Sequence, residues 1–346
     1  MKGHRFARNL KFQVSNFRSE VTLYLFSPAT EMLRSTMGSL QRIRLDVDGR
    51  RYTLSVLQRT SHPPEIPRLV IAAYQAEEQS HHLLRVCLTA IRKFTPEPHE
   101  LWVVDRTTRR EYRRWLLEQP GLNVVFLHDI PLMRSQRGLG FRLRMLTLDQ
   151  RDREARVQGS YANAVQLEIA AALIDPQARR LMTLQMDTMP TAPYWLSFLL
   201  SKFDDQTGAV GVRLETHKGP PPFPHSLGCL VDWQLFLRYR LSFLPELPRW
   251  DVLHKAIAEL MDRGYRIWCC RNTYAEPELI KSLPAESPYR SLHVDRTLDD
   301  SGNVIFLHLG RGIEKSSSGQ TPPGRTSPAD WTRFAGRIFT ADPLSP

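Results

Sequence analysis

Continuous apolar runs alternate with helical patterns from residue 68 onward, and this alternation limits the possible folds most strongly. Residues 68–74 (ArgLeuValIleAlaAlaTyr) form an unbroken run, which is typical of a strand buried on both faces of a parallel sheet. The next stretch, 81–94, places Leu84, Leu88 and Ile91 on one helical face. Strand and helix then continue to alternate with short connections. We therefore expect an α/β fold with a doubly wound, mostly parallel sheet.

The chain divides into three predicted parts. Residues 1–66 contain short alternating runs and an Asp-Gly dipeptide (48–49) that indicates a β-hairpin. This β-rich N-terminal extension is either a small subdomain used for docking or an extension that caps the main sheet. Residues 67–312 are the predicted main α/β domain. Residues 313–346, which begin rich in Ser, Gly and Pro, are expected to form a flexible C-terminal tail with a short helix near 329–338.

The composition indicates a globular protein with an excess of basic side chains. Of its 346 residues, 42% are hydrophobic, and 47 Lys and Arg against 36 Asp and Glu give a net charge of +11. Arginines cluster at 108–114 and 134–144. Basic surfaces suit anionic partners such as nucleotide diphosphates, nucleic acid or acidic lipid headgroups, and a solvated basic face is the alternative. No nucleic-acid-binding motif accompanies the clusters, so we expect no nucleic-acid partner.

Targeting signals are not evident in the sequence. No stretch approaches the about 20 uninterrupted apolar residues of a membrane-spanning helix. The basic N-terminus is not followed by an apolar signal segment, so export is not expected. The 4 cysteines lack metal-ligand spacing and are typical of buried free thiols in a reducing compartment. We expect a cytoplasmic protein, with peripheral contact to an acidic membrane surface as an alternative.

Asp187 directly follows the polar end of a predicted buried strand, Leu181 to Leu184. Open α/β sheets bind ligands at the carboxyl ends of their strands. A carboxylate at this place could hold Mg²⁺ or Mn²⁺, which prefer oxygen ligands and commonly bridge phosphates. The alternative is an Asx turn leading into ThrMetPro.

Three other side chains have comparable positions. Asp105 ends the second predicted strand and could accept hydrogen bonds from a base or ribose, or simply form a turn. Asp251 follows Trp250 at the start of a predicted helix. It could deprotonate an acceptor hydroxyl, with its pKa shifted by the indole, or be the helix N-cap. His308 ends the last strand and is either a nitrogen ligand to a metal or a hydrogen-bonded core histidine.

The order and setting of several short motifs resemble the inverting, family 2-type glycosyltransferases with a GT-A fold. The resemblance covers roughly 68–312. Its motifs are IleAlaAlaTyrGlnAlaGlu (71–77), TrpValValAspArgThrThr (102–108), GlySerTyrAlaAsnAla (159–164), LeuGlnMetAspThrMetPro (184–190), TrpAsp (250–251) and PheLeuHisLeuGlyArgGly (306–312).

The resemblance implies a metal-dependent enzyme that moves a sugar from a nucleotide-diphosphate donor to a hydroxyl acceptor with inversion. The acceptor would be a glycan, a lipid-linked molecule or a protein. By resemblance, Asp187 and His308 would hold a divalent cation, Mn²⁺ or Mg²⁺, and Asp251 would be the general base. The nucleotide-sugar pocket would be formed by Ala73, Tyr74, Glu77, Asp105, Ser160, Asn163 and Met186.

The sequence departs from the family pattern at two positions. Gln185 replaces the first aspartate of the usual Asp-any-Asp metal motif, so one anionic ligand is lost. Trp250 stands where a glutamate often precedes the catalytic aspartate. These departures leave open a catalytically impaired nucleotide-sugar-binding or scaffold protein. A nucleotidylyltransferase and a dinucleotide-binding dehydrogenase are less consistent, because the turn after the first strand lacks the glycine-rich phosphate loop that each requires.

Overall fold

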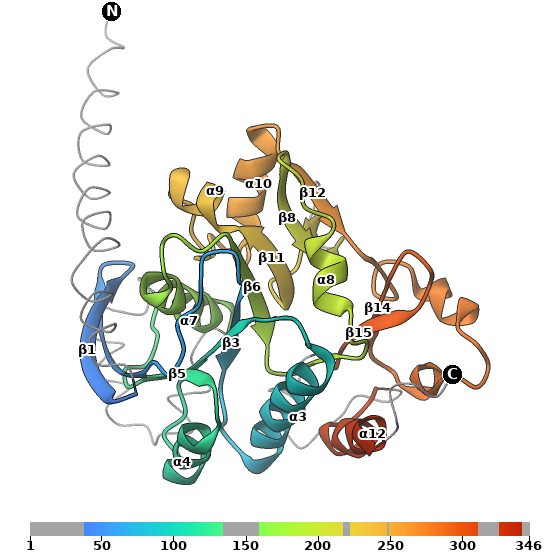
Figure 1. Ribbon diagram of the computed structural model, residues 1–346, viewed down its shortest axis with the longest axis horizontal. Helices are drawn as coiled ribbons and strands as arrows, with labels where there is room; N and C mark the ends of the chain where they lie inside the picture. The colour runs from blue at the N-terminus through green and yellow to red at the C-terminus, as the bar shows by residue number, and fades with distance from the viewer. Residues whose placement is uncertain (1–37, 134–158, 217–221, 248, 311–324, 341–346) are drawn as a thin grey trace, which may run out of the picture.

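The computed structural model describes residues 38–133, 159–216, 222–247, 249–310 and 325–340. These residues form an α/β body with a central sheet and helices on both of its faces (Figure 1). The strands expected before residue 38 and the basic cluster at 134–144 lie outside the described residues.

The central sheet has the strand order β1–β2–β5–β4–β3–β6–β11–β8–β12. Strands β2 and β11 are antiparallel to both of their neighbours, and the other strands run in one common direction. The expected α/β fold with a mostly parallel sheet is therefore confirmed. The strands are β1 (Leu40–Val47), β2 (Arg50–Leu57), β3 (Arg68–Ala73), β4 (Glu100–Asp105), β5 (Leu122–Leu127), β6 (Arg180–Gln185), β8 (Thr207–Gly211), β11 (Gly228–Asp232) and β12 (Arg266–Cys269).

The predicted hairpin is β1–β2, and it extends the central sheet. Asp48 and Gly49 at its tip both have positive φ, 50° and 67°, as a two-residue hairpin turn requires. Strand β2 pairs with β5, so the hairpin continues the sheet rather than forming a separate β-subdomain within the described residues. The boundaries of the three sequence-defined parts stay a prediction.

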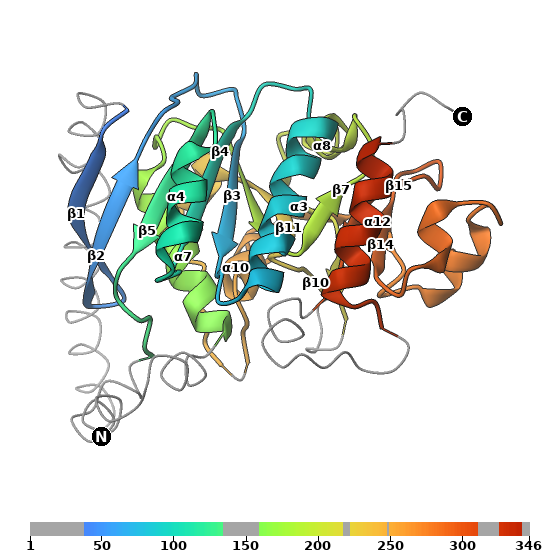
Figure 2. The same ribbon diagram turned by 90° about the horizontal axis from the view of Figure 1, so that it is seen from below.

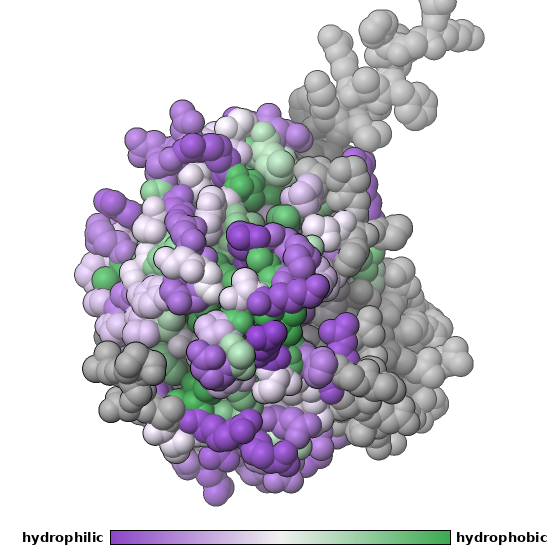
Figure 3. Space-filling model, turned by 90° about the vertical axis from the view of Figure 1, so that its right-hand side faces the viewer, coloured by the Kyte–Doolittle hydropathy of each residue, from purple (hydrophilic) through white to green (hydrophobic). Residues whose placement is uncertain are grey.

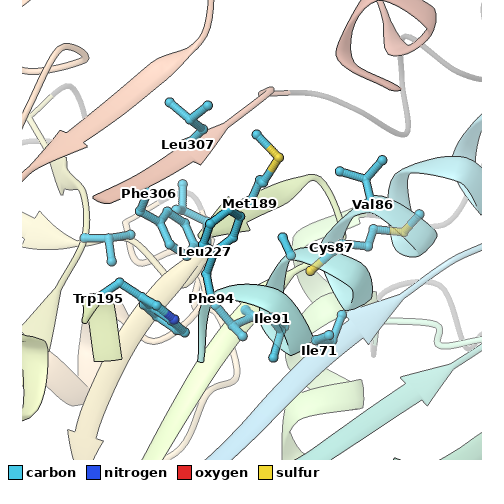
Figure 4. Packing of buried hydrophobic residues seen from close by; sticks show 14 of the residues in the cluster. Ile71, Val86, Cys87, Ile91, Phe94, Met189, Trp195, Leu227, Phe306 and Leu307 are labelled. Atoms are coloured by element: carbon cyan, nitrogen blue, oxygen red, sulfur yellow. The ribbon is translucent and has the colours of Figure 1, made fainter. Parts of the chain in front are cut away.

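One face of the sheet is covered by α3 (Glu78–Phe94), α4 (Arg110–Glu118) and α8 (Trp195–Leu200), and α12 (Pro328–Thr340) packs beside α3. In Figure 2, α3 and α4 lie on the near side of the central sheet, and α12 lies next to α3. Figure 4 shows Cys87, Ile91 and Phe94 of α3 packed with Met189 and Phe306. These contacts join the central sheet to a second, smaller sheet.

The opposite face is covered by α7 (Gly159–Leu173), α9 (Trp233–Arg238) and α10 (His254–Asp262). Alternate residues of β3 serve the two faces: Leu69 and Ile71 belong to the α3 side, and Val70 and Ala72 to the α7 side. Burial on both faces accounts for the unbroken apolar run at 68–74.

The second sheet has the order β13–β14–β15–β7. Hydrophilic side chains dominate the surface at this end of the molecule, with hydrophobic ones between them (Figure 3). A separate two-stranded hairpin pairs β9 with β10. The elements are β7 (Thr188–Pro190), β13 (Arg271–Asn272), β14 (Asp295–Leu298), β15 (Val304–His308), β9 (Leu214–Glu215), β10 (Phe223–Pro224) and the 3₁₀ helices η2 (Pro277–Ser282) and η3 (Pro288–Ser291).

Part of the predicted C-terminal tail is a packed helix. Trp331 and Phe334 of α12 are buried in the core that includes α3. Lys93 Nζ of α3 donates hydrogen bonds to the carbonyl oxygens of Ile338 and Phe339, at 3.3 and 2.6 Å, near the end of α12. The buried apolar residues of α12 thus stabilise a docked helix. Residues 313–324 and 341–346 of the predicted tail lie outside the described residues.

No helix within the described ranges is long and apolar enough to cross a membrane. The cysteines are free thiols, as the sequence predicts.

The docking of α12 yields a stability prediction. Trp331 is fully buried, so Trp331→Ala should lower the free energy of unfolding by about 3–5 kcal/mol through lost contacts and a new cavity. Urea unfolding followed by circular dichroism would measure this. The control is Arg333→Ala on the same helix, whose side chain is 72% exposed and pairs only with Asp330 in the described contacts. It should cost less than about 1 kcal/mol. Equal losses would contradict the packed position of α12.

Candidate active site

Three neighbouring parallel strands end at the same edge of the central sheet. In the β-pairing, Ala73 of β3 lies opposite Asp105 of β4, and Ala72 lies opposite Gln185 of β6. The residues that follow these strands therefore meet at the carboxyl edge, as expected for parallel neighbours. The Tyr74 backbone N–H donates to Met186 Sδ at 3.2 Å and links the ends of β3 and β6.

Asp187 and His308 come together because β7 pairs with β15. His308 lies opposite Thr188 in the antiparallel register, and the Leu309 backbone N–H donates to the Asp187 carbonyl oxygen at 3.0 Å. The His308 Nε2 atom is 3.6 Å from Asp187 Oδ2, and each side chain is 7% exposed. The two residues predicted as metal ligands are thus neighbours in a buried position.

A second carboxylate and an arginine lie on the other side of the His308 ring. His308 Nδ1 is 2.8 Å from Asp295 Oδ2, and Arg213 Nη1 is 3.0 Å from the same oxygen. Arg213 Nη2 donates to Glu215 Oε2 at 3.0 Å, and its guanidinium lies 3.8 Å from the Tyr274 ring centre. Burial raises the pKa of Asp295, but the His308 hydrogen bond and the Arg213 charge outweigh it and leave this pKa below its usual value.

The carboxylates of this cluster differ in their arginine partners. Asp295 interacts with Arg213, Arg325 and the buried Arg296, and Glu215 pairs with Arg213. Asp187 is buried beside His308. Carboxylate oxygen and imidazole nitrogen are both ligands that Mn²⁺ accepts. The residues present therefore fit a divalent cation at Asp187 and His308.

The protein would supply few ligands to such a cation. No group of three or more His, Cys, Asp or Glu side chains with metal-holding geometry occurs in the described part of the chain. Mg²⁺ is commonly bound by one or two protein carboxylates together with substrate phosphates and water. A two-residue site agrees with that pattern, and Gln185 adds no carboxylate to it.

Asp105 is fully buried and belongs to a hydrogen-bonded chain. Gln75 Nε2 donates to Asp105 Oδ2 at 3.0 Å, and Gln75 Oε1 is 2.5 Å from His81 Nδ1. Burial raises the pKa of Asp105 to about 7, and burial together with Arg85 lowers the pKa of His81 to about 4. Asp105 has no exposed surface, so its predicted contact with a base or ribose stays a prediction.

Arg106, which follows Asp105 in the sequence, is partly exposed. Its guanidinium lies 3.4 Å from the centre of the Tyr74 ring, a stacked cation–π arrangement. Tyr74 was predicted for the nucleotide pocket, whereas Arg106 was not singled out by the sequence. Glu77 caps the N-terminus of α3 through the Ser80 hydroxyl and is partly exposed at the same edge.

Helix α7 brings Ser160 and Asn163 toward this edge. Gln166, one turn after Asn163, donates to the carbonyl oxygens of Ala73 at 2.7 Å and Val104 at 2.6 Å. The first turn of α7 therefore lies near the ends of β3 and β4, and Ser160 and Asn163 are partly exposed there. Ser160 belongs to the first turn of α7.

Asp251 lies before α10 and does not cap it. The N-cap is Leu253, which has a φ of 70°, so the alternative of Asp251 as a helix cap is wrong. Asp251 is 9% exposed, and its Oδ1 accepts a hydrogen bond from the Val252 backbone N–H at 2.8 Å.

The β9–β10 hairpin connects the Asp251 segment with the Arg213 cluster. Phe223 of β10 lies opposite Glu215 of β9. The Phe223 ring stacks on His254 at 4.8 Å and contacts Trp250 at 5.5 Å, on either side of Asp251 in sequence. Gly211 permits this approach, since a Cβ there would lie 2.3 Å from the Cβ of Pro224.

Comparison with known proteins yields distant structural likenesses. No family model matches the sequence, and no curated protein matches it. A mannosyltransferase from Pyrobaculum calidifontis, solved with GDP-Man and Mn²⁺, is 14% identical over 95% of this chain and 80% of its own, with a TM-score of 0.41. The galactosyltransferase LgtC, solved with donor and acceptor sugar analogues, is 12% identical over 80% of this chain and 97% of its own, with a TM-score of 0.43.

A 4-diphosphocytidyl-2C-methyl-D-erythritol synthase from Anaerococcus prevotii is also similar, with 13% identity over 60% of this chain and 89% of its own. Its TM-score is 0.34. Because all of these TM-scores are below 0.5, no activity is transferred from these proteins to this chain.

The buried Asp105 predicts a specific pH dependence of stability. Its pKa is about 7 in the folded protein and roughly 4 when unfolded, so its burial costs little below pH 4. As the pH rises through 7, ionisation of Asp105 lowers the free energy of unfolding by a few kcal/mol at most. Asp105→Asn should therefore lose less stability than the wild type between pH 5 and pH 8 in urea unfolding. Asp46→Asn, an exposed control, should keep the wild-type pH dependence.

Proposed function

We propose that this protein is a metal-dependent inverting glycosyltransferase that uses a nucleotide-diphosphate sugar and a hydroxyl acceptor. The observation that carries the proposal is the buried pair Asp187 and His308, with Nε2 and Oδ2 3.6 Å apart beside the carboxyl edge of the sheet. The oxygen and nitrogen donors of this pair and its position at the strand ends support a cation and a phosphorylated ligand. The resemblance of the sequence motifs agrees with this chemistry.

Asp187 and His308 would hold the divalent cation. When bound, the cation supplies positive charge against the charge that develops on the diphosphate leaving group. Tyr74 and Arg106, stacked at the ends of β3 and β4, offer an aromatic ring and a cationic group to the nucleotide. Ser160 and Asn163 at the start of α7 offer polar groups to the sugar-diphosphate, near the positive end of the helix.

Asp251 would act as the general base. Its carboxylate takes a proton from the acceptor hydroxyl while that oxygen attacks the anomeric carbon, and the diphosphate leaves from the opposite side. A single displacement of this kind inverts the anomeric centre. The rings of Phe223 and Trp250 contact each other, and Trp250 directly precedes Asp251, so these apolar groups would limit the access of water there.

A second proposal has a specific observation in its favour. Gln185 replaces an acidic metal ligand, and the described residues contain no cluster of three candidate ligands. A protein with weak cation binding would bind the nucleotide sugar without transferring it. Hydrolysis of a sugar nucleotide in the presence of Mn²⁺ would favour the enzyme, and binding without any turnover would favour the impaired protein. Cytoplasmic location and peripheral contact of the basic clusters with an acidic membrane surface remain predictions.

The donor and the metal site can be tested together. Melting temperatures measured with UDP-, GDP- and dTDP-sugars plus Mn²⁺ should identify one donor class that stabilises the protein by mass action. Asp187→Ala should abolish the Mn²⁺-dependent part of this shift. The control is Asp300→Ala, which removes an exposed carboxylate paired with Lys202 and should leave the shift unchanged. An unchanged shift in Asp187→Ala would remove that residue from the metal site.

The general base can be tested with the donor class found in that screen. Asp251→Asn should lower kcat by about 10²–10⁴-fold while the donor affinity stays near that of the wild type. Glu246→Gln, an exposed position paired with Lys255, is the control and should retain activity. Near-normal turnover of Asp251→Asn would exclude the role. The anomeric configuration of the product, read by NMR, would separately decide whether transfer inverts.

A further inference from the structure

The Asp295 carboxylate receives two donors at one oxygen. Oδ2 lies 2.8 Å from His308 Nδ1 and 3.0 Å from Arg213 Nη1. Arg213 is itself fixed by Glu215 at 3.0 Å and by the Tyr274 ring at 3.8 Å. Asp295 is at the start of β14 and opposite His308 in the β14–β15 register, so the main chain also holds this contact.

These distances decide which nitrogen of His308 carries a proton. An ionised carboxylate can only accept hydrogen bonds, so the 2.8 Å contact requires a proton on Nδ1. Arg213 Nη1 is also 3.2 Å from His308 Nδ1, but arginine only donates and cannot share a hydrogen bond with a protonated Nδ1. His308 Nδ1 and Arg213 Nη1 therefore both donate to Asp295 Oδ2. They lie close to each other because they share this acceptor.

The opposite ring nitrogen, Nε2, is the one that lies nearer Asp187. In the neutral imidazole a proton on Nδ1 leaves Nε2 as the acceptor. Nε2 and Asp187 Oδ2 are 3.6 Å apart, beyond hydrogen-bond distance. Two cation ligands about 2.1 Å from a common ion lie roughly 3–3.5 Å apart, which is close to this spacing.

We propose that Asp295, held by Arg213, is a positioning residue that selects the Nδ1–H tautomer of His308 and so presents Nε2 as a metal ligand. This inference rests on the proposed function for the identity of the bound cation. Asp295 does not touch the cation itself. A carboxylate behind a ligating histidine fixes the ring and raises its basicity, and its loss typically lowers metal affinity 10–100-fold.

The chain contains a matched control for this role. Glu215 is a second buried carboxylate on the same arginine, and its side chain contacts Arg213 and Tyr274. Glu215→Gln removes a negative charge from the same cluster as Asp295→Asn. A purely structural or long-range electrostatic effect would appear in both variants, whereas tautomer selection would be lost in Asp295→Asn alone.

The first measurement needs no metal and no substitution. Long-range ¹H–¹⁵N correlation spectra of the full-length, ¹⁵N-histidine-labelled protein report which ring nitrogen is protonated, and His308→Ala identifies the His308 signals. The wild type should show Nδ1–H without added metal, and Glu215→Gln should keep it. Asp295→Asn should lose this preference, because an amide can either accept from or donate to the ring.

Calorimetric titration with Mn²⁺ alone gives the second measurement. Asp295→Asn should bind Mn²⁺ 10–100-fold more weakly than the wild type, and Glu215→Gln should remain within about threefold. Thermal melts would verify that both variants fold.

The outcomes separate this inference from the proposed function. An Nε2–H tautomer in the wild type, or equal effects of the two variants, would overturn the role of Asp295 while leaving Asp187 and His308 as ligands. A wild type with Nδ1–H that binds no Mn²⁺ would instead overturn the metal site on which the proposal rests.

Discussion

The antiparallel pairing of β7 with β15 is the interaction on which the candidate site depends. It places His308 opposite Thr188 and lets the Leu309 N–H bond to the carbonyl of Asp187. A shift of this register by one residue would turn the His308 side chain to the other face of the small sheet. The apolar residues of β15 lie in the core with α3 and therefore oppose such a shift.

The fold could be predicted from the sequence where local patterns are strong. The unbroken apolar run of β3 reflects burial on two faces, and Asp-Gly at the hairpin tip reflects a turn with positive φ. The end of the chain was harder to interpret because a short helix is stabilised by its contacts rather than by its own sequence. Burial of Trp331 against the α3 side supplies those contacts.

The candidate site was predictable only in part. Asp187 and His308 each follow or end a recognisable strand, which is the signal that found them. Asp295 and Arg213 lack such a signal, because their importance arises from strand register and from a shared hydrogen-bond acceptor. Asp251 was predicted at the start of a helix, whereas α10 begins at His254 with Leu253 as its N-cap, and the role of Asp251 stays a prediction.

The two sheets meet at a stiff corner. Between β6 and β7 the chain has only two residues outside the strands, and β12 is separated from β13 by Cys270 alone. A hinge at this corner would have to bend in both places and disrupt the core shared with α3. The backbone consequently constrains the distance between Asp187 and His308, the two residues proposed to hold a cation. A bound ion would then be selected by how well its radius fits this fixed distance, because the site could not contract around a smaller ion.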